Sequence, residues 1–179
     1  MISQNDHAII NAITPVLQTA ASTHNFSFSK LDANGQPFAQ ANIFLNMGTV
    51  STSADVFSEI TVYESDTITT PSSMATVIPA FGASATTDAS HGWSFTTGAT
   101  GAGLGGIVEF QMDLRKRKKY IGVYVLAPAA SNVVTFSAIV LLSKGAESRD
   151  SASDANHYGA VYGNLCATNA RGCITRIIG

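Results

Sequence analysis

The side chains of this chain that could bind a metal or act as nucleophiles are four histidines and two cysteines. They are His7, His24, His91, His157, Cys166 and Cys173. No two of the histidines have metal-binding spacing, and two cysteines cannot supply a four-thiolate zinc site. A catalytic pair of Cys166 and His157 is conceivable, but one Cys near one His in a polar segment is weak support for catalysis. We therefore predict that the protein is not an enzyme and holds no metal or cofactor.

The same two cysteines allow two non-catalytic states. Cys166 and Cys173 are seven positions apart, so a disulfide between them would close a small loop if the protein functions outside cells. The alternative is two reduced, partly buried thiols.

Carboxylates and glycines give no stronger sign of a catalytic or cofactor site. The carboxylates are too dispersed to nominate an acid/base pair, and those at strand ends are expected to be turn or solvent residues: Glu64, Asp66, Asp88, Glu109 and Asp113. Residues 101–106 have the spacing G-x-G-x-x-G, but a dinucleotide-binding loop follows a strand and opens a helix. These glycines precede a strand-like segment, which favours a flexible loop.

A run of five cations is the strongest chemical feature of the sequence. Arg115, Lys116, Arg117, Lys118 and Lys119 hold half of the ten Lys and Arg, in a chain whose net charge is −2. Five like charges repel one another, which favours an exposed position. The run is then a solvated turn, a clamp on an acidic surface of another subunit, or a nucleic-acid contact. Nucleic acid is the weakest of the three because stacking aromatics and a wider basic field are missing. We predict a contact with another subunit or a shell.

The residues around this run have the pattern of strands. Residues 108–114 alternate apolar and polar side chains without a fault, as in a strand with one buried face. The basic run follows, then the apolar segment 120–126, a break at 128–132 and a further strand at 133–142. This order predicts an up-down-up β meander with the basic run at its first turn.

The whole chain reads as an all-β protein with a single β-sandwich or jelly-roll domain. Further strand-like segments lie at residues 26–28, 41–48 and 57–64, and residues 67–106 are rich in Thr, Ser, Ala and Gly, as expected of long loops. Short strands separated by turn signals, with no clear helix, favour this architecture. We predict an N-terminal arm or edge strand at 1–23, the sandwich at 24–147, and a linker and extended tail at 148–179.

Composition suggests a subunit of an assembly. Only 12% of residues are charged, and charges are depleted from interface cores. We expect a symmetric homo-oligomer, most simply a trimer, because a jelly roll has open edges that must be covered. The two terminal segments should cross onto neighbours, which would bury Ile174, Ile177 and Ile178 there.

The sequence predicts neither a transmembrane helix nor a secretory signal. Residues 120–143 carry no charge, but Pro128, Ser131 and Asn132 interrupt them and β-branched residues are frequent, so a transmembrane helix is disfavoured. The start of the chain is polar and its apolar part is broken by Pro15, so no secretory signal is expected.

Taken together, the segments resemble small structural proteins of tailed bacteriophages, namely capsid decoration (cement) proteins and related minor virion proteins with a jelly-roll core. The resemblance covers about residues 8–147. It depends on the order of four segments, at residues 9–15, 60–66, 112–120 and 134–143. The tail after Asp150 is longer than this family pattern.

The resemblance implies a non-enzymatic virion component without catalytic residues. Its partners would be further copies of itself and the major capsid protein or other virion subunits, on the exterior of a capsid assembled in the host cytoplasm. The alternative is a carbohydrate- or receptor-binding module of a phage tail or adhesin, with Trp93 and Tyr158 as sugar platforms.

Overall fold

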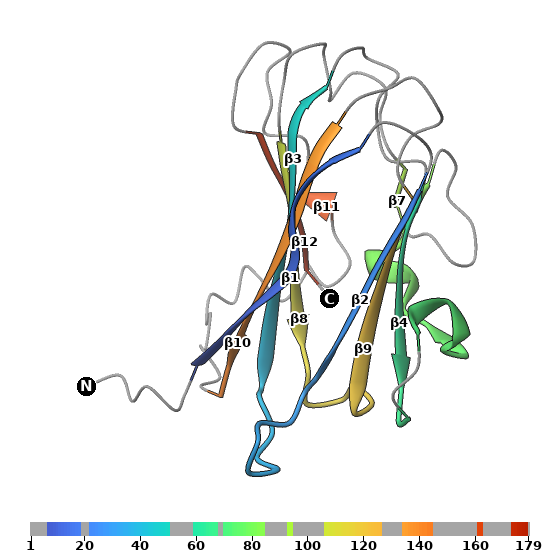
Figure 1. The fold of residues 1–179 in the computed structure, drawn as a ribbon. Coiled ribbons are helices and arrows are strands. Elements are labelled where there is room, and N and C mark those ends of the chain that lie inside the picture. The colour runs from blue at the N-terminus through green and yellow to red at the C-terminus, as the bar shows by residue number, and fades with distance from the viewer. Residues whose placement is uncertain are drawn as a thin grey trace.

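The described strands form two β-sheets that face each other (Figure 1). The computed structural model describes residues 7–18, 22–50, 59–67, 70–84, 93–94, 106–126, 134–144, 161–162 and 173–178. The first sheet, sheet A, has the order β1-β10-β3-β8-β12-β11, and the second, sheet B, has the order β2-β9-β4-β6-β7 with β5 paired to β4. The bounds are β1 His7–Gln18, β2 Thr23–Ser29, β3 Gln40–Val50, β4 Glu59–Ser65, β5 Thr76–Val77, β6 Ala83–Ser84, β7 Trp93–Ser94, β8 Gly106–Asp113, β9 Tyr120–Leu126, β10 Val134–Ser143, β11 Val161–Tyr162 and β12 Cys173–Ile178.

The strand order is that of a jelly roll. From β1 to β4 the chain changes sheet at every connection, and it does so again from β8 to β9 and from β9 to β10. The antiparallel sets β1-β10-β3-β8 and β2-β9-β4-β6 therefore interleave in sequence, which is how two Greek keys build a double sheet. The predicted all-β sandwich is confirmed.

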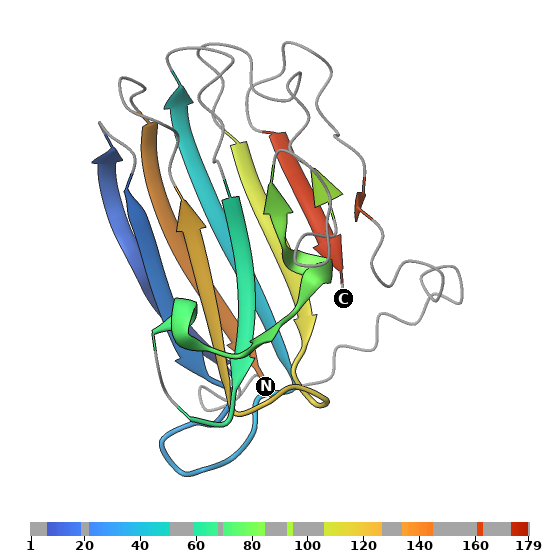
Figure 2. The same ribbon diagram turned by 90° about the vertical axis from the view of Figure 1, so that its right-hand side faces the viewer.

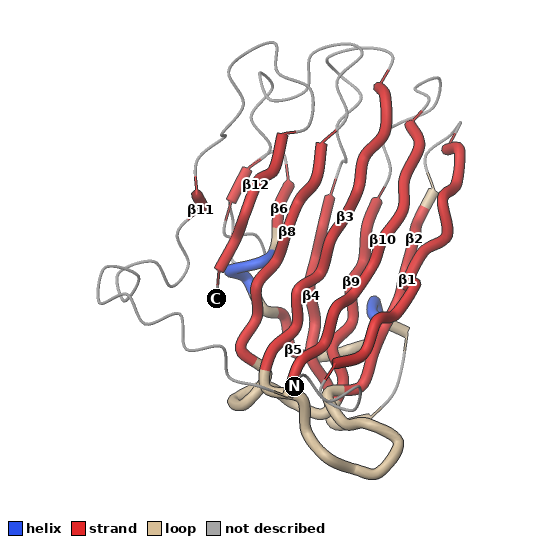
Figure 3. The backbone as a smooth tube through the Cα atoms, turned by 90° about the vertical axis from the view of Figure 1, so that its left-hand side faces the viewer, coloured by secondary structure: helices blue, strands red, loops and turns tan. Residues whose placement is uncertain are grey.

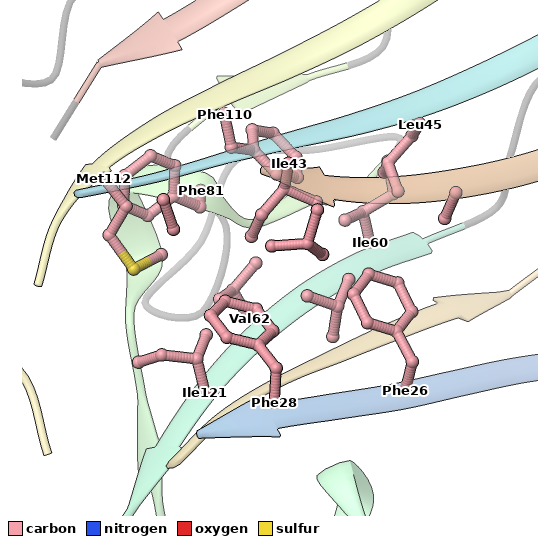
Figure 4. Close-up of a cluster of buried hydrophobic side chains, with 14 of the residues drawn as sticks. Phe26, Phe28, Ile43, Leu45, Ile60, Val62, Phe81, Phe110, Met112 and Ile121 are labelled. Carbon is pink, nitrogen blue, oxygen red and sulfur yellow. The ribbon is translucent and has the colours of Figure 1, made fainter. Parts of the chain in front are cut away.

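The core lies between the two sheets and follows the alternation of the strands. Each strand points every second side chain inward, and the two inner faces interdigitate (Figure 4). Sheet A supplies buried residues such as Ile43, Leu45, Phe110 and Met112, and sheet B supplies Phe26, Phe28, Ile60, Val62 and Ile121. Burial of these side chains stabilises the sandwich by about 25 cal/mol for each Å² of apolar surface removed from water.

The predicted meander at 107–142 is wrong. All three strands exist, but they do not pair with one another: β8 and β10 lie in sheet A, whereas β9 lies in sheet B between β2 and β4. The alternation of apolar residues shows which face of a strand is buried, but it does not show which strand lies beside it. The basic run is therefore a connection between the two sheets.

Both terminal segments contribute strands to the sheets of their own chain. β1 is an edge strand paired with β10, as in the edge-strand alternative for the first segment. β12 pairs in parallel with β8, and β11 pairs with β12 (Figure 3). Ile174, Ile177 and Ile178 thus belong by their backbone to β12. Cys173 begins that strand, and Cys166 lies outside the described residues, as does the proposed pairing of the two thiols.

A strap of two short 3-10 turns crosses the outer face of sheet B (Figure 2). These turns are η2 at Pro71–Ser73 and η3 at Pro79–Phe81. Pro71 and Met74 are buried, and they stand over Gly122 of β9, where a Cβ atom would come within 2.7 Å of the Met74 sulfur. At the other end of the strap, Phe81 enters the core and meets Phe110 edge-on, with ring centroids 5.5 Å apart.

Candidate functional site

One end of the sandwich gathers the positive charge of the described chain. Strand register places the ends of β2, β4, β8 and β10 and the starts of β1, β3 and β9 at this end. We call it the basic end and define it by seven residues: Lys30, Arg115, Lys116, Arg117, Lys118, Lys119 and Lys144. Every Lys or Arg whose side chain the structure describes lies here. The loops that carry these residues lie below the sheets in Figure 3.

The basic turn is fixed by hydrogen bonds to its backbone. The N–H of Arg117 donates to the carbonyl of Leu114 (3.1 Å), and the N–H of Leu114 donates to the carbonyl of Ala39 (2.8 Å). Lys30 holds the turn twice: its N–H donates to the Lys119 carbonyl (2.9 Å), and its Nζ donates to the Arg117 carbonyl. The turn is therefore held by Lys30, which follows β2 in sheet B, and by Ala39, which precedes β3 in sheet A.

Three carboxylates complete the turn. Glu64 Oε2 accepts a hydrogen bond from the N–H of Lys118 (3.1 Å), and Asp66 Oδ1 accepts one from the N–H of Lys119 (3.4 Å). Asp113 pairs with Arg115 at 2.6 Å and also accepts from its backbone N–H. These hydrogen bonds from Arg115 lower the pKa of the Asp113 carboxyl, because they favour its charged form.

The neighbouring loop between β2 and β3 is organised by Asp32. Its Oδ1 accepts from the N–H groups of Asn34 and Gln36, both at 2.8 Å, and its Oδ2 pairs with Lys144 Nζ at 2.6 Å. The bond from Lys144, followed by the one from Gln36, lowers the Asp32 pKa. Gly35 has φ 76°, which residues other than glycine rarely adopt. This exposed loop is thus well ordered beside the basic turn.

These contacts engage the side chains of five of the seven cations, one of which is Lys30, whose Nζ donates to the Arg117 carbonyl. Arg115 and Lys144 are in ion pairs, Lys118 donates its Nζ to Thr76 Oγ1 (2.7 Å), and Lys119 lies over the Tyr120 ring, 5.2 Å from its centroid. Within the described part of the chain, the side chains of Lys116 and Arg117 make no hydrogen bond or ion pair. Lys116 is exposed and Arg117 is half-buried, and we call these two the unengaged cations.

The basic end keeps an excess of positive charge. Seven cations share it with four carboxylates, Asp32, Glu64, Asp66 and Asp113, which leaves three positive charges uncompensated. Sequence reasoning found the run at 115–119 but missed Lys30 and Lys144. Both follow directly after a strand, and the up or down direction of those strands would have placed them beside the run.

The other candidate residues do not come together into a site. His7 lies in β1, and His24 lies in β2 against the ring of Phe136, where burial lowers its pKa. Glu109, predicted to be a solvent or turn residue, is instead 4% exposed and accepts a hydrogen bond from Gln111 Nε2 (2.8 Å). Trp93 forms part of β7. His91, Asp88, His157, Tyr158 and residues 101–105 lie outside the described residues.

Metal and membrane features can be stated only for the described residues. Among them, no group of three or more His, Cys, Asp or Glu could hold a metal ion. None of their helical segments has the length and apolar character needed to cross a bilayer.

The chain matches no protein-family model, and comparisons with curated proteins and with solved structures give no match either. The basic end must therefore be interpreted from its own chemistry.

Proposed function

We propose that the protein is a non-enzymatic structural component of a bacteriophage virion, a capsid decoration protein that attaches to the shell through its basic end. The observation that carries the attachment is the gathering of seven cations at one end of a jelly roll. The sequence resemblance to decoration proteins supports the virion assignment. An acidic surface on the shell is the complementary partner, because opposite potentials speed association and fix orientation.

The ordered turn makes this end suited to docking. The unengaged cations, Lys116 and Arg117, lie on a backbone that is already held by Lys30, Glu64 and Asp66. Binding then has to order little more than the two side chains, which lowers the entropic cost of association. An arginine also offers a planar fork of donors that matches a carboxylate.

Each contact is weak by itself. Exposed ion pairs contribute about 0.2–1 kcal/mol, so the two unengaged cations cannot hold one subunit on a shell. Several subunits that bind together multiply their affinities through effective concentration. The proposal therefore requires a multivalent arrangement on the particle.

The test compares two variants of equal charge. Lys116→Ser/Arg117→Ser removes the unengaged cations, and Arg115→Ser/Lys118→Ser removes two engaged cations from the same turn. Binding to particles that lack the protein is measured by co-sedimentation over a salt series. We expect the first variant to bind more weakly and with a flatter salt dependence, and the second to keep most of its binding. Equal binding of wild type and both variants would show that the run is a solvated turn without a role in attachment.

Composition and imaging of purified particles test the virion role itself. Mass spectrometry should find the protein at high copy number, and cryo-microscopy should place it on the head. A location on the tail at low copy number would favour the carbohydrate- or receptor-binding alternative, in which Trp93 and Tyr158 bind sugars. Its absence from particles would refute both.

A further inference from the structure

The free edge of sheet B lacks the features by which proteins normally protect an edge strand. β2 (Thr23–Ser29) ends the sheet and pairs with β9 over all seven residues without a register shift (Figure 2). Its sequence, THNFSFS, contains no Lys, Arg, Asp, Glu or Pro. Charges, prolines and bulges are the usual means of preventing an edge from pairing with another chain. β2 has none of them.

The neighbouring edge of sheet A is different. β1 contains Pro15, and its pairing with β10 has two register shifts, between Asn11 and Ile13 and between Ile13 and Val16. A proline removes a donor and a bulge bends the strand, so this edge is a poor template. On this side of the sandwich, therefore, only sheet B offers a regular edge.

The hydrogen-bond phase of β2 shows which groups face outward. The N–H of Lys30, just after the strand, donates to the carbonyl of Lys119. Since in-plane groups alternate along an antiparallel strand, residues 24, 26 and 28 face β9. The N–H and C=O groups of Thr23, Asn25, Ser27 and Ser29 then face the free edge. Among the described residues, none forms a backbone hydrogen bond with these outward groups.

We propose that β2 pairs with β2 of a second copy of this chain, antiparallel about a twofold axis at Phe26. This register places Asn25 opposite Ser27 of the second copy and Thr23 opposite Ser29, and it repeats both pairs by symmetry. All four outward-facing residues of each copy then exchange backbone hydrogen bonds. Sheet B becomes continuous across the two subunits.

The side chains of the strand suit a second copy. The side chains of Thr23, Asn25, Ser27 and Ser29 lie on the outer face of sheet B and supply three hydroxyls and one amide. Thr and Ser side chains that lie opposite each other on paired strands form hydrogen bonds. β2 contains no Lys, Arg, Asp or Glu, so the twofold axis brings no like charges together. A twofold contact of this kind is isologous, so one patch serves both subunits. It predicts a dimer in place of the trimer expected from composition, and it does not depend on the proposed virion role.

The first experiment removes one outward donor. Ser27→Pro deletes an N–H at the free edge and leaves every N–H that faces β9, so the fold should persist. Ser27→Ala keeps the N–H and is the matched control. Sedimentation equilibrium of the full chain, with a monomer mass of 18.6 kDa, should show dimers for wild type and Ser27→Ala and monomers for Ser27→Pro. A monomeric or trimeric wild type, or a dimeric and folded Ser27→Pro, would overturn the proposal.

A second pair of variants decides the matter if Ser27→Pro does not fold. Asn25→Lys/Ser27→Lys and Asn25→Glu/Ser27→Glu each place like charges opposite each other in the proposed register. Each variant alone should be monomeric, and an equimolar mixture should restore a dimer that contains one chain of each. Dimers of either variant alone, or no restored dimer in the mixture, would refute antiparallel pairing at this register.

Discussion

Gly122 is the position where the strap over sheet B leaves least room, and Gly122→Ala tests that packing. A Cβ atom there would lie 2.7 Å from the Met74 sulfur, 3.0 Å from Met74 Cε and 3.1 Å from Pro71 Cβ. The Met74 end can swing aside, whereas the proline ring must move with the strap. Extra methyl groups in a packed site cost about 1–3 kcal/mol. Replacement of a strand glycine by alanine also stabilises the folded state by about 0.5–1 kcal/mol, because the unfolded chain loses conformational freedom.

The expected net loss is therefore about 1 kcal/mol, which corresponds to a fall in Tm of about 2–4 °C for a domain of this size. Thermal and urea unfolding followed by circular dichroism measure it. Met74→Ala supplies the control background, because it removes the side chain nearest to the new methyl group. In that background only the Pro71 contact remains, so Gly122→Ala should cost less, and the difference between the two costs is the coupling between positions 74 and 122. An unchanged Tm, or an equal cost in both backgrounds, would refute the packing of the strap on Gly122.

Two other predictions concern charge and the core. Asp113→Asn should lower Tm at neutral pH by about 1–3 °C, since an exposed pair contributes about 0.2–1 kcal/mol. The folded pKa of Asp113 is lowered by Arg115, so this stabilisation is complete above the unfolded pKa of about 3.9 and is lost as the pH falls through the folded pKa. A difference in Tm between Asp113→Asn and wild type that persists at pH 2 would show that the Asp113–Arg115 pair is not its cause. Phe81→Ala should cost about 3–5 kcal/mol in urea unfolding, because Phe81 has 0% exposure and closes the core against Phe110; a cost below about 1 kcal/mol would show that the strap does not seal the sandwich.

The sequence predicted the positions of the strands better than it predicted which strands pair with each other. Residues 108–114 alternate so regularly that the buried face of β8 could be read directly, and Phe110 and Met112 are indeed in the core. The same alternation fits a hairpin and a crossing between sheets equally well, because both leave one face of each strand buried. The choice between them depends on β3 and β12, the two strands that lie beside β8.

At the basic end, too, the sequence did not show which distant residues come together. The run at 115–119 is visible because its charges are consecutive. Lys30 and Lys144 each stand alone in the sequence and reach the site through contacts with Arg117 and Asp32, which are 87 and 112 positions away. Strand direction shows at which end of the sandwich the two lysines lie, but the residues that they contact follow from the order of strands in a jelly roll.

The position of β10 has a consequence for how the chain is made. β1 leaves the ribosome well before its partner β10, and His7 lies opposite Ser143. β10 also lies between β1 and β3, so β1 has no partner in sheet A until residue 143 has been synthesised. Such non-local pairings form in milliseconds to seconds, and open strands invite aggregation meanwhile. A chain that ends before β10 leaves β1 and β3 without the strand that joins them, so the basic end forms on a closed sandwich only after β10 has been made.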